Sequence, residues 1–190
     1  MYIIKKEKIN ELIIKNSRFI GIIFPVTTEE EISKIIEDLN KKYKDYTHLV
    51  YAYKINNKQK ATDDGEPTGT AGTPVLEVIN KNNLNNVLIV VIRYFGGIKL
   101  GAGGLIRAYS KTAREVLKLT EKEIYIDYNY YKLITDYDNL KLLNTLTNNI
   151  EITKKDFSEK ITYEIKIEKE KDNIEKIFNN TNIKFKKISN

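Results

Sequence analysis

Glycine and proline are confined to the first part of this 190-residue chain. All nine glycines lie between Gly21 and Gly104, the last proline is Pro74, and the last alanine is Ala113. The rest of the sequence consists mainly of residues that favour helices and strands. Because turn-forming residues mark where compact elements join, this change in composition predicts two domains, residues 1–123 and 124–190.

The composition excludes several classes of protein. With 41% apolar and 31% charged residues, the chain has the profile of a soluble globular protein. Its longest apolar run, Val87 to Ile92, is too short for a transmembrane helix, and its first residues lack the apolar stretch of a secretory signal. We therefore expect a cytoplasmic protein. The absence of cysteine and the single histidine, His48, lead us to expect no metal site and no cofactor.

The first domain is expected to mix strands and helices. Apolar patterning predicts strands over residues 9–14, 18–26, 48–55 and 87–94, the last of them buried on both faces. A capping box at Thr28–Glu31 predicts one helix, and further helices are expected from Thr73-Pro74 onward and over residues 103–119. Residues 56–70 are expected to form a polar loop.

The second domain shows a regular alternation of periodicities. The expected strands are residues 124–134, 151–156, 160–168 and 183–188, and the expected helices are residues 138–147 and 172–179. This βαββαβ order is that of a ferredoxin-like sandwich. The whole chain is thus predicted to be an α+β protein of two domains.

An acidic loop precedes the helix that is expected from Thr73-Pro74 onward. Asp63, Asp64 and Glu66 place three carboxylates within four positions, and such oxygens suit a divalent cation. Alternatively, the Asp-Gly and Glu-Pro pairs build turns and order the loop without any ion. Both interpretations remain open from the sequence.

A glycine-rich turn joins the buried strand to the last helix of the first domain. Free main-chain N–H groups at such a helix start can bind an anion, and Gly101, Gly103 and Gly104 would supply them. The turn lacks the Gly-Lys-Ser/Thr of a Walker loop and the glycine spacing of a dinucleotide fingerprint. The alternative is a tight connection that only glycine can make.

The helix after this turn carries a basic stripe. At about 100° per residue, its basic residues share a sector about 60° wide, namely Arg107, Lys111, Arg114 and Lys118. Within and beside this stripe, the residues expected to contact nucleic-acid phosphates are Arg93, Lys99, Arg107, Lys111 and Arg114. The chain has only four arginines, which suggests that these positions need a planar guanidinium. The alternative is an ordinary solvated helix face.

Four segments together resemble the IMPACT family, and more narrowly its bacterial YigZ branch. They are Ser17–Ile20, His48–Tyr53, Asp63–Gly72 and Val91–Gly101, the last continuing to Tyr109. The Arg-Tyr-Phe-Gly-Gly stretch is the most specific part. The positions that carry the family motif are Arg18, His48, Thr68, Gly69, Thr70, Tyr94, Gly96 and Gly97.

The resemblance implies both a fold and a function. The first domain is expected to be an α/β sandwich like the second domain of ribosomal protein S-five, and the second to resemble the ferredoxin-like domains of elongation factor G. Eukaryotic relatives regulate translation through an activator of the amino-acid-starvation kinase, partly by an RWD domain. We expect no RWD domain here, so the resemblance implies nucleic-acid binding rather than control of the kinase.

Three functions follow from these observations. The leading hypothesis is a non-catalytic, translation-associated regulator that binds RNA or the ribosome, with no DNA sequence specificity and no membrane contact. The first alternative is a Mg-dependent small-molecule phosphotransferase, with the glycine turn holding phosphates and Asp63 or Asp64 holding the ion. The second is a protein-binding module with a translation-related partner. We assign no catalytic residue.

Overall fold

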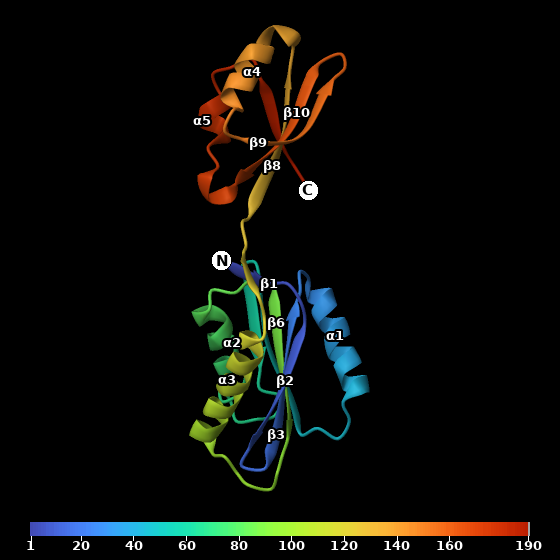
Figure 1. The fold of residues 1–190 in the computed structure, drawn as a ribbon, viewed down its shortest axis with the longest axis vertical. Coiled ribbons are helices and arrows are strands. Elements are labelled where there is room, and N and C mark those ends of the chain that lie inside the picture. The colour runs from blue at the N-terminus through green and yellow to red at the C-terminus, as the bar shows by residue number, and fades with distance from the viewer. Residues whose placement is uncertain (190) are drawn as a thin grey trace. The chain divides into compact units, whose positions relative to one another are not determined.

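The chain folds into two compact units. A computed structural model describes residues 1–189, and they divide into Met1–Tyr125 and a second unit that begins at Ile126 (Figure 1). The division falls two residues after the position that composition indicated. Both units combine helices with antiparallel sheets, so the expected α+β fold of two domains is confirmed.

The N-terminal unit is built on a five-stranded antiparallel sheet in the order β2-β3-β6-β4-β5. The strands are β2 (Lys8–Ile14), β3 (Ser17–Pro25), β4 (His48–Ile55), β5 (Lys58–Thr62) and β6 (Val87–Tyr94). The helices are α1 (Glu29–Lys42), α2 (Gly72–Lys81) and α3 (Ala102–Lys118). Helix α1 covers one face of the sheet, and α2 and α3 cover the other (Figure 1).

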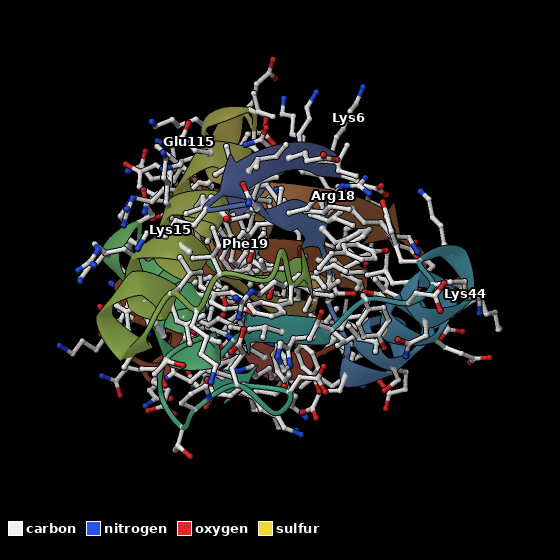
Figure 2. The ribbon with its side chains drawn as sticks, turned by 90° about the horizontal axis from the view of Figure 1, so that it is seen from below. Lys6, Lys15, Arg18, Phe19, Lys44 and Glu115 are labelled. Carbon is white, nitrogen blue, oxygen red and sulfur yellow. The ribbon has the colours of Figure 1, made fainter. Side chains whose placement is uncertain are left out.

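This three-layer arrangement explains the sequence of the central strand. Leu88, Val90 and Ile92 pack toward α1, whereas Val87, Ile89 and Val91 pack toward α2 and α3. Because successive side chains of a strand point to opposite faces, a strand covered on both sides is apolar at every position. The same alternation carries Arg93 into the α2/α3 layer. In Figure 2, Phe19 lies in the interior of the unit, while Lys6 and Lys44 extend from its periphery.

The capping box at the start of α1 forms as expected. The Thr28 hydroxyl accepts a hydrogen bond from the main-chain N–H of Glu31 at 3.2 Å. In return the Glu31 carboxylate accepts the N–H of Thr27 at 2.7 Å, one residue earlier than the usual partner. Main-chain donors that the helix leaves unpaired are thereby satisfied.

Two strands depart from the expectation. Strand β5 lies inside the segment predicted to be a loop, and it pairs with β4 at the edge of the sheet. The predicted strand over residues 124–134 is interrupted near the division between the units. Its first part belongs to β7 (Lys122–Ile124), which pairs with β1 (Tyr2–Ile4) and thus joins the beginning and end of the N-terminal unit.

The C-terminal unit has the expected βαββαβ order. Its strands are β8 (Tyr128–Thr135), β9 (Glu151–Phe157), β10 (Ile161–Glu168) and β11 (Lys184–Ile188), in the sheet order β11-β8-β10-β9. The helices α4 (Leu140–Leu146) and α5 (Ile174–Phe178) cover one face, preceded by short 3₁₀ turns at Tyr137–Asn139 and Lys169–Lys171. This arrangement is the ferredoxin-like sandwich. Among residues 1–189, no helix has the length and apolarity needed to cross a membrane.

Candidate functional site

A buried polar network lies where β6 ends. The side chain of Arg93 is 5% exposed, and its Nη1 lies 2.5 Å from Oε1 of Glu66. The guanidinium lies over the rings of Phe19 and Phe95, at 5.4 and 5.5 Å. This placement differs from the expectation that Arg93 contacts phosphates along α3. In the alternation of β6 the side chain points into the α2/α3 layer, and Glu66 neutralises it there.

One carboxylate oxygen organises the network. Besides Arg93, Oε1 of Glu66 accepts a hydrogen bond from the Tyr109 hydroxyl at 2.8 Å and lies 3.8 Å from Nε2 of His48. Burial of the ring, together with the negative charge of Glu66, raises the pKa of Tyr109 well above its usual range. The phenol therefore stays protonated and acts as a hydrogen-bond donor to Glu66. Four side chains from β4, β6, α3 and the acidic loop thus meet at one point.

The acidic loop fixes the orientation of His48. Nδ1 of His48 lies 2.6 Å from the carbonyl oxygen of Asp64. A carbonyl can only accept, so Nδ1 carries a proton and Nε2 is the nitrogen turned toward Glu66. The Asp64 carboxylate in turn accepts the main-chain N–H of Leu49 at 2.6 Å. These bonds attach the loop to the first residues of β4.

Asp63 holds the other half of the loop together. Its two oxygens accept the main-chain N–H groups of Gly69, Ala71 and Gly72, at 2.8, 3.0 and 2.8 Å. Burial pushes the pKa of Asp63 upward, but these three donors outweigh it and lower the pKa below its usual value. Among residues 1–189 there is no group of three acidic or histidine side chains arranged to hold a metal ion. Because Asp63 and Asp64 both accept main-chain N–H groups, their geometry favours the interpretation in which these carboxylates order the loop.

The glycine-rich turn shows two distinct requirements for glycine. At Gly96 a Cβ atom would lie 2.0 Å from the carbonyl oxygen of Asn16, so close approach of two main chains excludes any larger residue. At Gly101, the residue before α3, φ is +68°, a value that L-residues rarely adopt. The first hydrogen bond of α3 runs from the N–H of Leu105 to the carbonyl of Gly101. The N–H groups of Gly103 and Gly104 precede it and have no partner within the helix.

The basic residues expected to contact phosphates are exposed, apart from Arg93. They are Lys99 on the glycine turn and Arg107, Lys111 and Arg114 on α3. Within the described chain none of these four takes part in an ion pair, whereas Lys118 pairs with Glu115 at 2.7 Å. The stripe is thus an exposed, positively charged surface, although the charge of Glu115 also acts on Lys111 and Arg114.

A pocket of about 370 Å³ connects the buried network to the start of α3. Its polar lining comprises Thr47, His48, Glu66, Arg93 and Lys99. The other lining residues are apolar or small, namely Pro67, Phe95, Leu100, Gly101, Ala102 and Leu105. The volume is within the range of small-ligand sites. This pocket is the candidate functional site.

The remaining family-motif positions lie outside the pocket. Arg18 pairs with Glu11 at 2.9 Å and lies over the ring of Tyr94. The Thr70 hydroxyl donates to the carbonyl of Pro67 at 2.7 Å. Gly69 and Gly97 have positive φ in their turns, and the side chain of Thr68 is exposed. None of these residues lines the pocket.

Sequence reasoning missed four residues that complete the site. The sequence indicated Tyr109 only as the end of the last family-like segment, although a buried tyrosine hydroxyl usually has a polar partner. Ser17 accepts the N–H of Gly96 at 3.2 Å, and Thr47 accepts the N–H of Phe95 at 2.9 Å. Phe95 lies at the mouth of the pocket and is exposed. The available signal was a polar residue at the start of each strand, because Ser17 is the first residue of β3 and Thr47 directly precedes β4.

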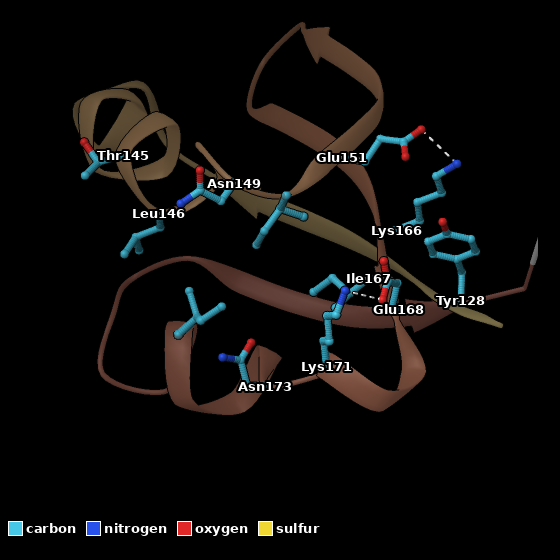
Figure 3. A pocket seen from close by; sticks show the side chains of 12 residues that line it. Tyr128, Thr145, Leu146, Asn149, Glu151, Lys166, Ile167, Glu168, Lys171 and Asn173 are labelled. Atoms are coloured by element: carbon cyan, nitrogen blue, oxygen red, sulfur yellow. Dashed lines mark ion pairs between the residues drawn. The ribbon is translucent and has the colours of Figure 1, made fainter. Parts of the chain in front are cut away.

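A second hollow, of about 460 Å³, lies in the C-terminal unit between the ends of α4, α5 and β10 (Figure 3). Two ion pairs lie along it, Lys166 with Glu151 at 2.8 Å and Lys171 with Glu168 at 2.6 Å. Each cation in this hollow already has a carboxylate partner. The N-terminal pocket has instead the unpaired basic stripe beside it, so we place the candidate site there.

The part of the chain that forms this site matches a known protein family. The Impact N-terminal domain matches residues 15–117, which include the acidic loop, the glycine turn and all of α3 except its last residue. This chain belongs to the IMPACT family. The match covers more than half of the chain and contains every residue of the pocket. The resemblance seen in the sequence motifs is thereby confirmed.

Bacterial members of the IMPACT family are among its relatives. YvyE of Bacillus subtilis (strain 168) is 49% identical over 119 residues, which are 61% of this chain and 55% of that protein. A member from Haemophilus influenzae is 34% identical, covering 73% of this chain and 70% of the relative. YigZ of Escherichia coli (strain K12) is 30% identical, and the alignment covers 70% of this chain and 68% of YigZ. This chain thus matches just over half of the length of YvyE.

Solved structures support the fold of the IMPACT chain. A crystal structure of a hypothetical protein aligns with a TM-score of 0.69 over 99% of this chain and 97% of its own. The two sequences are 24% identical, so the likeness bears on the fold. It extends through both units of the chain.

Proposed function

We propose that this protein is a non-catalytic, translation-associated regulator that acts in the cytoplasm and binds RNA or the ribosome through its N-terminal unit. The observation that supports it best is the unpaired basic stripe of Lys99, Arg107, Lys111 and Arg114, which leads away from the pocket. Exposed cations without acidic partners suit the regular negative charge of a phosphodiester backbone. The association with translation comes from membership of the IMPACT family, whose eukaryotic relatives are expected to regulate translation.

Arg93 has another role in this proposal. Its guanidinium is buried beside Glu66, so it supports the pocket rather than the phosphate track. The N–H groups of Gly103 and Gly104 stand at the beginning of the track, where the helix dipole favours negative charge. The track thus combines four flexible cations with main-chain donors fixed by the turn.

The salt dependence of binding to a single-stranded RNA tests the proposal. Four phosphate contacts predict that log K falls against log salt with a slope of roughly −2.8. Exchanging Arg107 and Arg114 together for Glu should lower both the affinity and the slope. The matched control exchanges Lys34 and Lys44 for Glu in the same way. Both lysines are exposed, in α1 or just after it, and the change should leave RNA binding unchanged. A flat salt profile, or equal losses in both double variants, would contradict RNA binding through this surface.

A protein-binding module is the second candidate. Three apolar side chains are exposed on the glycine turn and on α3, namely Phe95, Ile98 and Ile106. Exposed apolar groups next to a pocket are common where proteins meet. In this case a translation-related partner should bind this chain without RNA, and nuclease treatment should not release it. The phosphotransferase alternative has less support, because the Asp63 and Asp64 carboxylates are both committed to main-chain N–H groups.

A further inference from the structure

We infer that the pocket beside Glu66 receives a guanine base. The inference deepens the proposed function, because the same unit would hold a nucleotide's phosphate at the mouth of the pocket and its base inside. It rests on three properties of the pocket: the hydrogen-bonding character of its polar end, its apolar walls, and its size.

The polar end of the pocket presents acceptors with fixed positions. The hydrogen bonds from Arg93 and Tyr109 and the close approach of His48 all fall on Oε1 of Glu66. Oε2 of the same carboxylate is therefore the oxygen left for a ligand. Nδ1 of His48 lies 2.6 Å from the carbonyl of Asp64 and therefore carries a proton, which makes Nε2 the acceptor nitrogen in this tautomer of the imidazole. A ligand that satisfies this end needs two neighbouring donors.

The walls of the pocket suit a flat ring. Pro67, Phe95, Leu100 and Leu105 line it, and the Phe95 ring is 46% exposed. Aromatic side chains of this kind stack on unpaired bases. The volume of about 370 Å³ accommodates a heterocycle with part of its sugar. Because Arg93 and Glu66 neutralise each other, the interior also favours a neutral ring over a free anion.

Guanine is the base whose edge matches these acceptors. Its N1–H and its exocyclic 2-amino group are adjacent donors, and proteins read unpaired bases through this edge. Adenine and cytosine each offer one amino donor beside an acceptor nitrogen, and uracil offers one N–H between two carbonyls. Only guanine places two donors side by side toward Glu66 and His48.

The phosphate of the same nucleotide would lie outside the pocket. Gly101 and Ala102 line its rim, and the free N–H groups of Gly103 and Gly104 follow them at the start of α3. Lys99 also lines the pocket and is exposed. Such a site would accept a guanine within an RNA strand or a free guanine nucleotide, since the base and its phosphate are common to both.

Binding of nucleoside monophosphates to the full chain by titration calorimetry tests the base preference without altering the protein. Guanosine monophosphate should bind roughly tenfold tighter than inosine monophosphate, which lacks only the 2-amino donor, and tighter still than adenosine monophosphate. Equal affinities for the three, or no saturable binding of guanosine monophosphate at millimolar concentration, would overturn the inference.

Two exposed residues provide a matched pair of variants. Phe95 and Ile98 lie on the same turn and are 46% and 45% exposed, but only Phe95 lines the pocket. Phe95→Ala should weaken guanosine monophosphate binding at least several-fold, and Ile98→Ala should not. Equal effects would overturn the assignment to this pocket.

Glu66→Gln should remove the preference for guanosine monophosphate over inosine monophosphate, provided that the circular dichroism of the variant shows a folded chain. A folded Glu66→Gln variant that keeps the preference would overturn the role of Oε2.

A second comparison distinguishes the two sources of guanine and separates this inference from the proposed function. A short oligouridine is compared with the same strand carrying one central guanine. Tighter binding of the guanine strand indicates an RNA guanine, whereas binding of guanosine monophosphate without that gain indicates a free nucleotide. Salt-dependent RNA binding with no preference for guanine, together with no binding of guanosine monophosphate, would retain the proposed function and refute the pocket. Binding of guanosine monophosphate together with a flat salt profile for RNA would retain the pocket and refute RNA binding through the basic stripe.

Discussion

Nη1 of Arg93 lies 2.5 Å from Oε1 of Glu66, and the two side chains are 5% and 4% exposed. The pair connects the end of β6 to the acidic loop and forms the polar end of the candidate pocket. Removing one partner of a buried ion pair leaves the other charge without compensation. The pair is thus required for the integrity of the pocket.

Replacing Arg93 alone should destabilise the N-terminal unit. We expect Arg93→Met to lower the free energy of unfolding by about 3–5 kcal/mol, because the Glu66 carboxylate remains buried. The double variant Arg93→Met with Glu66→Leu should recover much of this loss. Urea unfolding followed by circular dichroism measures both. As a control, Arg18→Met, which breaks the exposed pair with Glu11, should have little effect. A small loss for Arg93→Met would contradict the buried charge pair.

Two of the buried tyrosines, Tyr109 and Tyr131, should make the free energy of unfolding fall at high pH. Burial raises the pKa of Tyr109 above its usual range, and burial with a hydrogen bond to Asp172 raises the pKa of Tyr131 to about 12. In the unfolded chain both titrate near pH 10, so above that pH the unfolded state loses protons that the folded state keeps. Their stabilising contribution is complete below about pH 10 and is lost as pH rises through the folded pKa.

Unfolding free energies between about pH 9 and pH 11 measure this effect. Tyr109→Phe should flatten the decrease and should also cost about 1.5–3 kcal/mol at neutral pH, because a hydrogen bond to a charged acceptor is lost. Tyr131→Phe should flatten it independently through the C-terminal unit. An unchanged pH profile in Tyr109→Phe would show that its hydroxyl is not held against Glu66.

Asp63→Asn should loosen the acidic loop. The side-chain amide keeps one acceptor oxygen and places a donor where three main-chain N–H groups converge, which should cost about 1–3 kcal/mol. Amide hydrogen exchange should accelerate at Gly69, Ala71 and Gly72. Because the pKa of Asp63 is lowered in the fold, its contribution is present above about pH 4 and is lost as pH falls through the folded value. Asn at this position should abolish that acid sensitivity, whereas the exposed change Asp38→Asn should leave exchange in the loop unaltered.

Alanine at two neighbouring glycines should have clearly different effects. A Cβ at Gly97 would have nothing within 4 Å, but φ is +83°, so the cost is the conformational one of about 1–2 kcal/mol. A Cβ at Gly96 would lie 2.0 Å from the Asn16 carbonyl, and the turn before β3 would have to move. Thermal unfolding should show the greater loss for Gly96→Ala. Similar losses would mean that the two turns adjust at little cost.

The strands and helices that bury an apolar face were predictable from their periodicity. Strands β4 and β6 begin and end where the sequence indicated, and α1 begins at its capping box. Strand β5 was not predictable in this way, because its five residues, Lys58–Thr62, are polar or small and mostly exposed at the edge of the sheet. Pairing with β4 defines this strand, and pairing with a distant segment leaves no periodic signal.

The site was predictable in its parts but not in its assembly. The glycine turn, the exposed basic stripe and the acidic loop were each visible as motifs. The direction of Arg93 was not, because a strand covered on both faces shows no alternation from which to decide it. The partnership of Glu66 with Tyr109 joins residues 43 positions apart, and only the packing of α3 against the sheet brings them together.

One oxygen atom, Oε1 of Glu66, is shared by side chains from three different elements, His48 on β4, Arg93 on β6 and Tyr109 on α3. Substitutions at these positions therefore do not act independently, and their free energies should fail to add. A double-mutant cycle between Arg93 and Tyr109 would report a coupling energy although their own side chains meet only through the carboxylate. An exchange at one of these positions should therefore cost a different free energy when another of them has already been changed.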